Sequence, residues 1–239
     1  MKDSTEIICV IDRSGSMKSI QQDAIGGFNS FLAEQQALPG EATITLALFD
    51  SYTNYQLVYD NVTIDKAQPL NDLTFVPRGM TALYDAVGKT IDAVGIRLHN
   101  TNEADRPNKI LFVILTDGDE NNSKFYSQEK IKNMINHQRD VYNWNFVFLA
   151  ANQEAALSAQ NIAISGHNAM NFAQSGDSIN TAYSNLSSAT SKLRSAKWSP
   201  IISNQAFFDE SERDAVKIDH DKLKSFLKRE ESKKDDQKS

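Results

Sequence analysis

The chain contains a single cysteine, Cys9, and only four histidines among its 239 residues. A lone cysteine cannot form an internal disulfide, and its position within an apolar run indicates a buried structural thiol rather than a redox centre. The histidines are scattered along the sequence, which favours surface or packing roles over metal ligation. They are His99, His137, His167 and His220. The sequence therefore gives no support to a metal or redox site built on sulfur and nitrogen ligands.

A long hydrophobic run is also missing. The polar residues 1–6 lead into only five consecutive apolar residues, too few for a secretory signal, and no later segment reaches the roughly 20 residues that span a membrane. We therefore expect a cytoplasmic protein without a membrane partner. With 40% hydrophobic and 23% charged residues, the chain is typical of a soluble globular protein that is long enough to bury a full core.

Basic residues are in the minority, with 25 Lys and Arg against 31 Asp and Glu and a formal net charge of −6. Proteins that bind nucleic acid normally present a basic face that replaces condensed counterions, so we expect no nucleic-acid partner. The sequence also lacks a Gly-rich nucleotide loop and a G-x-S-x-G nucleophile turn. Arg13, Lys18 and Arg78 lie near the polar segments described below. They either assist an acidic ligand or are solvated surface residues.

Hydrophobic periodicity predicts an alternation of strands and helices. The predicted strands are residues 6–11, 42–49, 56–59, 109–116, 144–149 and 169–172. Apolar residues at helical spacing predict helices over 20–32, 83–98, 131–135 and 179–193, the last of them opened by Ser175. Strands 42–49 and 56–59 are expected to form one antiparallel edge hairpin. The alternation implies an α/β fold with a doubly wound, mostly parallel sheet and helices on both faces.

The C-terminal segment has a different composition. We divide the chain into a domain over residues 1–197 and a charged extension over residues 198–239, which is strongly mixed in charge toward its end. Four apolar residues of the extension have helical spacing: Val216, Leu223, Phe226 and Leu227. They predict either a short amphipathic helix that docks on the domain or a partner, or a transient helix in a disordered tail.

Oxygen-bearing side chains follow two of the predicted strands. Asp12-Arg13-Ser14-Gly15-Ser16 follows the first strand, and Thr116-Asp117-Gly118-Asp119 ends and follows strand 109–116. A third segment, Arg78-Gly79-Met80-Thr81-Ala82-Leu83, places Thr81 at the entrance of a helix. The ligand crevice of an open α/β sheet lies at the carboxyl ends of its strands, so Asp12 and Asp117 would meet if their strands are neighbours. Taken alone, the first segment is explained as a turn that caps the next helix, and Thr81 as a helix N-cap.

Together, these segments resemble the metal-ion-dependent adhesion site of von Willebrand factor type A domains, whose signature is D-x-S-x-S, then a distant Thr and a distant Asp. The resemblance covers about residues 4–195 and matches all five ligand positions: Asp12, Ser14, Ser16, Thr81 and Asp117. Residues 26–31 and 151–155 look like segments of stand-alone intracellular versions from bacteria and phages. The resemblance implies a Rossmann-like fold with the first and fourth strands side by side. It also implies that the three hydroxyls bind the metal most directly, while one or both aspartates act through water.

Hydroxyl and carboxylate oxygens without His or Cys suit a hard cation such as Mg²⁺, with Mn²⁺ as a substitute. Asp12 and Asp117 would neutralise the ion but leave it electrophilic at an open position, which a partner protein can fill with an Asp or Glu carboxylate. Asp119 and Glu120 are either further ligands or solvated residues of the same loop. Arg78 adds bulk and charge at the rim, where many relatives have a small residue.

We therefore expect a metal-dependent protein-binding module rather than an enzyme. The main alternative is a Mg²⁺-dependent phosphoryl-transfer hydrolase, because a carboxylate after the first strand beside Mg²⁺ also describes aspartate-nucleophile phosphatases. Those enzymes carry a second Asp two residues after the first, where this chain has Ser14, and they need a cationic phosphate clamp that the sequence does not reveal. A metal-independent scaffold that binds partners through the C-terminal segment is the third reading.

Overall fold

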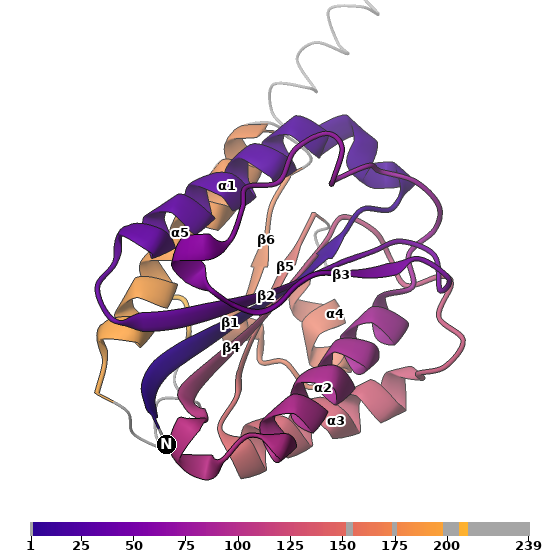
Figure 1. Ribbon diagram of the computed structural model, residues 1–239. Coiled ribbons are helices and arrows are strands. Elements are labelled where there is room, and N and C mark those ends of the chain that lie inside the picture. Colours follow the sequence, from indigo (N-terminus) through magenta and orange to yellow (C-terminus); the bar gives the residue numbers. More distant parts are fainter. Residues whose placement is uncertain (1, 152–154, 174–175, 198–205, 210–239) are drawn as a thin grey trace, which may run out of the picture.

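The computed structural model describes residues 2–151, 155–173, 176–197 and 206–209, which contain a six-stranded sheet (Figure 1). The strand order is β3-β2-β1-β4-β5-β6. All neighbouring strands are parallel except β2 and β3, which form the antiparallel edge. The strands are β1 (Lys2–Asp12), β2 (Glu41–Phe49), β3 (Tyr55–Thr63), β4 (Pro107–Thr116), β5 (Asn145–Ala150) and β6 (Ala169–Asn171).

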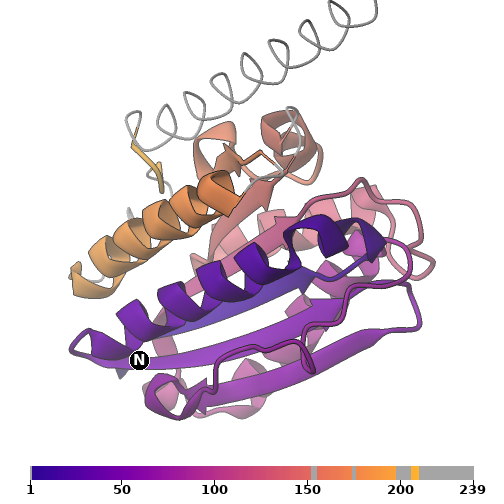
Figure 2. The same ribbon diagram turned by 90° about the horizontal axis from the view of Figure 1, so that it is seen from above.

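Helices cover both faces of this sheet, as Figures 1 and 2 show. α1 (Gln21–Ala37) and α5 (Gly176–Ser195) pack side by side on one face. α2 (Leu83–Asn100) and α3 (Gln128–Tyr142) lie on the other face together with the short α4 (Ala155–Asn161). The predicted α/β architecture, mostly parallel with one antiparallel edge strand, is confirmed.

The central strands are apolar on both sides because each side faces a helical layer. Along β1, Ile7, Cys9 and Ile11 join the core under α1 and α5, whereas Ile8 and Val10 join the core under α2 and α3. Strand β4 alternates in the same way. Cys9 is buried, in agreement with a structural thiol. The two continuous apolar runs in the sequence are therefore the two middle strands of the sheet.

Element boundaries differ from the predicted ones in places. The edge strand β3 extends to Thr63 instead of ending at residue 59, with irregular pairing to β2 and a left-handed backbone at Asn61 (φ 53°). Helix α4 was not predicted, and a 3-10 turn (Gly15–Ile20) precedes α1. Ser175 and the four apolar residues of the predicted tail helix lie outside the described residues.

The sheet topology decides where a site can form. From β1, the chain crosses to β2 on one side, while β4 pairs with β1 on the other side, so the winding direction reverses between β1 and β4. Ile11 is paired with Leu115, which places Asp12 and Thr116 at the same level where the two strands end. Open α/β sheets bind ligands at such a switch point. The predicted adjacency of the first and fourth strands is confirmed.

Residues 206–209 also pack on the domain. Phe208 is fully buried in the core under α1 and α5, and the Phe207 amide donates to Asn168 Oδ1 at 2.9 Å. Lys192 of α5 forms a salt bridge with Asp209. The core thus takes in a side chain from beyond residue 197.

Within the described residues, every helix is too short or too polar to cross a membrane.

Candidate metal site

Three loops meet at the carboxyl ends of β1 and β4. The first follows β1 and carries Ser14 and Ser16, the second precedes α2 and carries Thr81, and the third follows β4 and carries Asp117. The backbone joins the first two loops, because the Gly15 amide donates to the Gly79 carbonyl at 3.2 Å. The five residues predicted from the sequence are therefore brought to one place.

A continuous series of polar contacts runs from β1 to β4. The two oxygens of the Asp12 carboxylate accept from the Ser14 amide at 2.6 Å and from the Thr116 hydroxyl at 2.7 Å. The Ser14 and Ser16 hydroxyls are 3.0 Å apart, and the Ser16 hydroxyl donates to Asp117 Oδ1 at 2.6 Å. Asp12 and Ser14 are buried, whereas Ser16 is exposed, so the series opens to solvent at one end.

Thr81 approaches the same place from the second loop. A methyl group added to Gly118 would lie 3.1 Å from the Thr81 hydroxyl and 3.6 Å from the Ser16 hydroxyl, so both oxygens face one small space beside Gly118. The Thr81 amide donates to Asn121 Oδ1 at 2.9 Å, which fixes the backbone that carries this hydroxyl. Thr81 does not cap α2, since that helix begins at Leu83 with Ala82 in the cap position.

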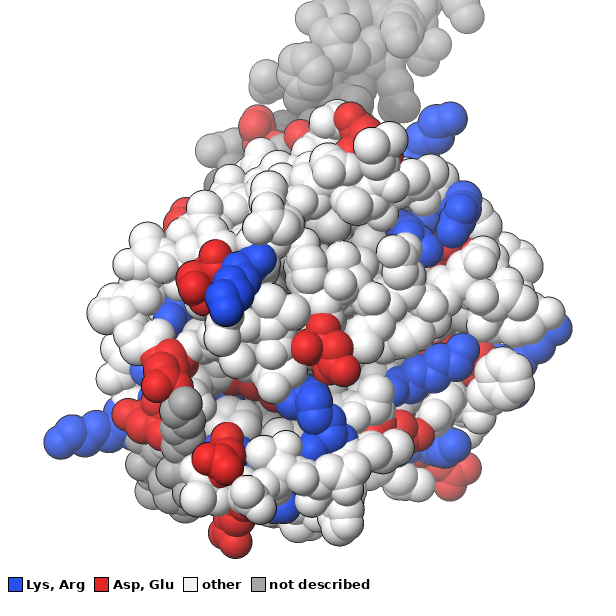
Figure 3. All heavy atoms as spheres, in the orientation of Figure 1, with Lys and Arg blue, Asp and Glu red and all other residues white. Residues whose placement is uncertain are grey.

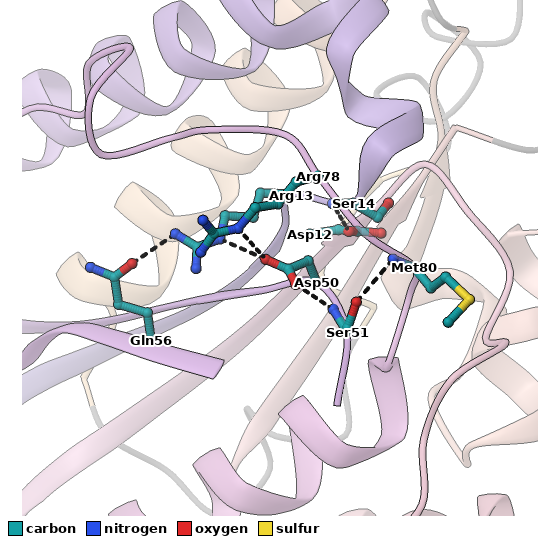
Figure 4. A network of polar contacts seen from close by, with 8 residues as sticks. All are labelled: Asp12, Arg13, Ser14, Asp50, Ser51, Gln56, Arg78 and Met80. Atoms are coloured by element: carbon teal, nitrogen blue, oxygen red, sulfur yellow. Dashed lines mark hydrogen bonds and ion pairs between the residues drawn. The ribbon is translucent and has the colours of Figure 1, made fainter. Parts of the chain in front are cut away.

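A buried carboxylate, Asp50, holds the first two loops against each other (Figure 4). Its Oδ2 lies 3.3 Å from Nε of Arg13 and 3.3 Å from Nε of Arg78, and its Oδ1 accepts from the Ser51 amide at 2.5 Å. Arg13 is only 4% exposed and also donates to Gln56 Oε1 at 2.7 Å. The reading of Arg13 as a solvated residue is wrong, because its guanidinium is a buried connection between β1, β2 and β3.

Glycine 79 is required for the close approach of these loops. Its backbone is left-handed (φ 71°), and a Cβ there would come within 2.5 Å of the Ser51 hydroxyl. That hydroxyl accepts from the Met80 amide at 3.2 Å, directly before Thr81. Only glycine combines this backbone conformation with the contact.

Two further carboxylates shape the third loop. Glu120 accepts from the amides of Tyr84, Asn122 and Ser123 at 2.7–2.9 Å, and also from the Ser123 hydroxyl. Asp85, which is 1% exposed, accepts from three consecutive amides of residues 124–126. Glu120 is therefore not simply a solvated residue, because it ties the loop to the start of α2.

Burial dominates the electrostatics of both aspartates. It raises the pKa of Asp12 to about 7, against the hydrogen bonds from Thr116 and Ser14, which lower it. Burial likewise raises the pKa of Asp117, and the Ser16 hydroxyl opposes that effect. Two carboxylates with raised pKa values in one small space make a bound cation favourable, because it would supply the missing positive charge.

The donor set fits a hard divalent cation. An octahedral Mg²⁺ with metal–oxygen distances of about 2.05 Å places neighbouring ligand oxygens about 2.9 Å apart. The 3.0 Å between the Ser14 and Ser16 hydroxyls matches that spacing. Among the described residues, no three His, Cys, Asp or Glu side chains gather to hold a metal ion. A metal held here would thus depend on hydroxyl oxygens, with Asp12 and Asp117 as its two acidic neighbours.

Sequence reasoning missed Asp50, Thr116 and Asp85. Asp50 directly follows the predicted strand 42–49, which is the same pattern that pointed to Asp12, so a signal was present. Thr116 belongs to the polar segment at the end of β4, but its position at the end of a predicted strand did not indicate a hydrogen bond to Asp12. Asp85 lies inside a helix, and only the three-dimensional approach of the third loop reveals its role.

No family model matches the chain, and no curated protein matches its sequence. Solved structures do match its fold. Proximal thread matrix protein 1 from the mussel byssus is 17% identical over 78% of this chain and 46% of that chain, with a TM-score of 0.55. The metal-ion-dependent adhesion site (MIDAS) motif of that structure is occupied by zinc. The pilus adhesin SpaC from Lactobacillus rhamnosus GG is 16% identical over 79% of this chain and 30% of that one, with a TM-score of 0.59.

A von Willebrand factor type A structure from Catenulispora acidiphila is 12% identical over 79% of this chain and 43% of that chain, with a TM-score of 0.51. The chain thus spans less than half the length of these proteins. Together with the sheet order and the site loops, these structural similarities show that the chain has the von Willebrand factor type A fold.

Proposed function

We propose that this chain is a metal-dependent protein-binding module, which captures an Asp or Glu carboxylate of a partner protein through Mg²⁺. The residues that would hold the ion are Asp12, Ser14, Ser16, Thr81 and Asp117. The observation that carries the proposal is the convergence of their oxygens from three separate loops at the switch point of the sheet. The zinc-occupied motif of the mussel protein supports metal dependence on this fold.

The donor chemistry supports Mg²⁺ as the resident ion, with Mn²⁺ as a substitute, because every candidate ligand is an oxygen. When bound, the ion supplies an electrophilic position to an incoming carboxylate. Asp12 and Asp117 would balance the charge of the ion. The Thr116 hydroxyl and the Ser14 amide orient the Asp12 carboxylate through hydrogen bonds. Asp50 holds the first two loops together through its ion pairs with arginines.

A binding role is favoured over catalysis by the pairing of Arg13. A phosphoryl-transfer enzyme needs cations that are free to clamp the phosphate. Arg13 is instead buried against Asp50 and Gln56, and Arg78 also pairs with Asp50. The net charge of −6 argues for a protein partner rather than nucleic acid. We place the protein in the cytoplasm on the sequence evidence given above.

Affinity capture from lysate of the source cells tests the proposal. The immobilised wild-type chain is compared in Mg²⁺ and in EDTA with Ser14→Ala and with Ser30→Ala, a matched control at an exposed position of α1. We expect proteins that wild type and Ser30→Ala recover only in Mg²⁺ and that Ser14→Ala does not recover. Equal recovery in all conditions contradicts metal-dependent binding. Mg²⁺-dependent turnover of para-nitrophenyl phosphate that Asp12→Asn abolishes would replace it with catalysis.

A further inference from the structure

Beside the metal-site loops lies a surface that the capture of one carboxylate does not use. It consists of Tyr52, Met80, Lys89, Lys124 and Phe125, and we call it the aromatic shelf. Met80 is 51% exposed and Phe125 is 62% exposed. In this way, two large apolar side chains face solvent next to the candidate metal site.

Asn122 joins the shelf to the metal site. Its amide donates to the Thr81 carbonyl at 3.1 Å, and its side-chain oxygen accepts from the Tyr52 amide at 3.0 Å. Its side-chain nitrogen lies 3.7 Å from the Met80 sulfur. The shelf therefore adjoins the loop that carries the Thr81 hydroxyl.

The shelf combines aromatic faces with cations. The Tyr52 and Phe125 rings are 6.3 Å apart, and the Lys124 ammonium lies 4.0 Å from the centre of the Tyr52 ring. The Lys89 ammonium lies 5.4 Å from the centre of the Phe125 ring and donates to the Tyr52 carbonyl at 3.3 Å. Neither lysine forms a salt bridge with any acidic side chain in the described part of the chain.

The backbone under the shelf is fixed. Asp85 accepts from the amides of Lys124 at 3.0 Å, Phe125 at 2.8 Å and Tyr126 at 2.9 Å. The Tyr126 ring covers Gly88 of α2, where an added Cβ would come within 2.2 Å of the ring. A partner that binds here does not have to order this loop, and pre-organised surfaces bind with less loss of conformational entropy.

Single exposed apolar residues are common on soluble proteins and need no ligand. The shelf differs because the Tyr52 and Phe125 rings are neighbours and Met80 is connected to Tyr52 through Asn122. Its two lysines have no salt-bridge partner in the described part of the chain, whose full sequence has a net charge of −6. On the right-hand side of Figure 3, the side toward which β1 runs in Figure 1, basic side chains lie among acidic ones. The two ammonium groups of the shelf are complementary to an acidic ligand.

We propose that the aromatic shelf is a second contact for the partner and that it selects an acidic peptide segment with a large apolar side chain. This inference rests on the proposed function, since one carboxylate of that segment occupies the metal site. The apolar side chain packs on Tyr52, Met80 and Phe125, and a second carboxylate pairs with Lys124 or Lys89.

Peptide selection tests this proposal without a known partner. Random dodecapeptides displayed on phage are bound to the full-length chain in Mg²⁺ and eluted with acid, and the affinities of the recovered peptides are measured by fluorescence anisotropy in Mg²⁺ and in EDTA. The shelf variants are Lys124→Glu and Phe125→Ala. Their matched controls are Lys132→Glu, exposed on α3, and Ile96→Ala, 64% exposed on α2. Ser14→Ala reports on the metal site.

We expect recovered peptides to carry an Asp or Glu, a large apolar residue and a second acidic residue. Lys124→Glu and Phe125→Ala should each weaken binding about tenfold, while the controls and the Mg²⁺ affinity stay unchanged. If the peptides bind in a Mg²⁺-dependent way but the shelf variants behave like their controls, the shelf proposal fails and the proposed function stands. Peptides that need the shelf but bind equally in EDTA and to Ser14→Ala contradict the proposed function, and with it the part of this proposal that places one carboxylate in the metal site. Recovery of no peptide overturns both.

Discussion

Burial of the Asp12 carboxylate predicts that the metal-free protein loses stability as the pH rises. The side chain is fully buried, and its pKa in the folded chain is about 7 against 3.8 without the fold. The folded carboxyl group therefore holds its proton more tightly than the unfolded one. Its contribution to the free energy of unfolding is constant below about pH 4, falls between about pH 4 and pH 7, and is constant again above that range.

The size of this effect follows from the two pKa values. A difference of about three pH units corresponds to about 4 kcal/mol at full ionisation. Between pH 5 and pH 8 the loss is about 2.5 kcal/mol, because part of the window lies below pH 5. Asp12→Asn keeps the shape of the side chain and removes its titration. In EDTA, the stability of this variant relative to wild type should therefore increase by about 2.5 kcal/mol from pH 5 to pH 8.

Urea unfolding in EDTA at the two pH values measures this difference. Asp65→Asn, the same substitution at an exposed site, serves as the control and should show no such change. Added Mg²⁺ should stabilise wild type at pH 8 more than Asp12→Asn, because only wild type has an ionised carboxylate at this position for the ion to compensate. A constant difference in stability between wild type and Asp12→Asn across this pH range would contradict the raised pKa of Asp12.

Three other substitutions test the structure in different places. Gly118→Ala adds a methyl group against the Thr81 and Ser16 hydroxyls, so the Mg²⁺ affinity measured by calorimetry should fall at least tenfold. Gly95→Ala adds its methyl group to open space and should leave the Mg²⁺ affinity unchanged. Asp50→Ala leaves the buried Arg13 charge without its carboxylate partner and should lower the free energy of unfolding, measured in urea, by about 3–5 kcal/mol. A loss below about 1 kcal/mol would mean that Asp50 and Arg13 do not form a buried ion pair. Phe208→Ala should cost about 3–5 kcal/mol in the same assay, and an unchanged midpoint would mean that residues 206–209 do not belong to the folding unit.

The middle of the fold was predictable because its signal is local. Strands β1 and β4 are continuous apolar runs followed at once by polar residues, and their burial by helices on both faces requires that pattern. The edge was less predictable. Strand β3 is half-exposed and irregularly paired, and its register shifts near Asn61 depend on contacts with β2 rather than on its own composition.

The oxygen donors of the candidate site were predictable from the sequence, but the carboxylates that hold its loops in place were not. The donors follow strand ends in the sequence, so their positions can be counted along the chain. Asp50 acts through two arginines from different loops, and Glu120 and Asp85 act through amides that the sequence places in another segment. Such contacts depend on which loops the sheet order brings together. This is also why Arg13, for which the sequence left open a ligand-assisting or a solvated role, is in fact buried.

A calorimetric titration of the chelator-treated full-length chain with Mg²⁺, alongside Thr81→Ala and Thr63→Ala, tests whether the three loops form a metal site. Thr81 comes from the loop before α2, which follows neither β1 nor β4 directly. Thr63 lies at the end of β3, away from the site loops. We predict one ion per chain for wild type and Thr63→Ala and at least tenfold weaker binding for Thr81→Ala. Absence of binding to wild type, or equal binding to all three chains, would contradict a metal site formed by these loops.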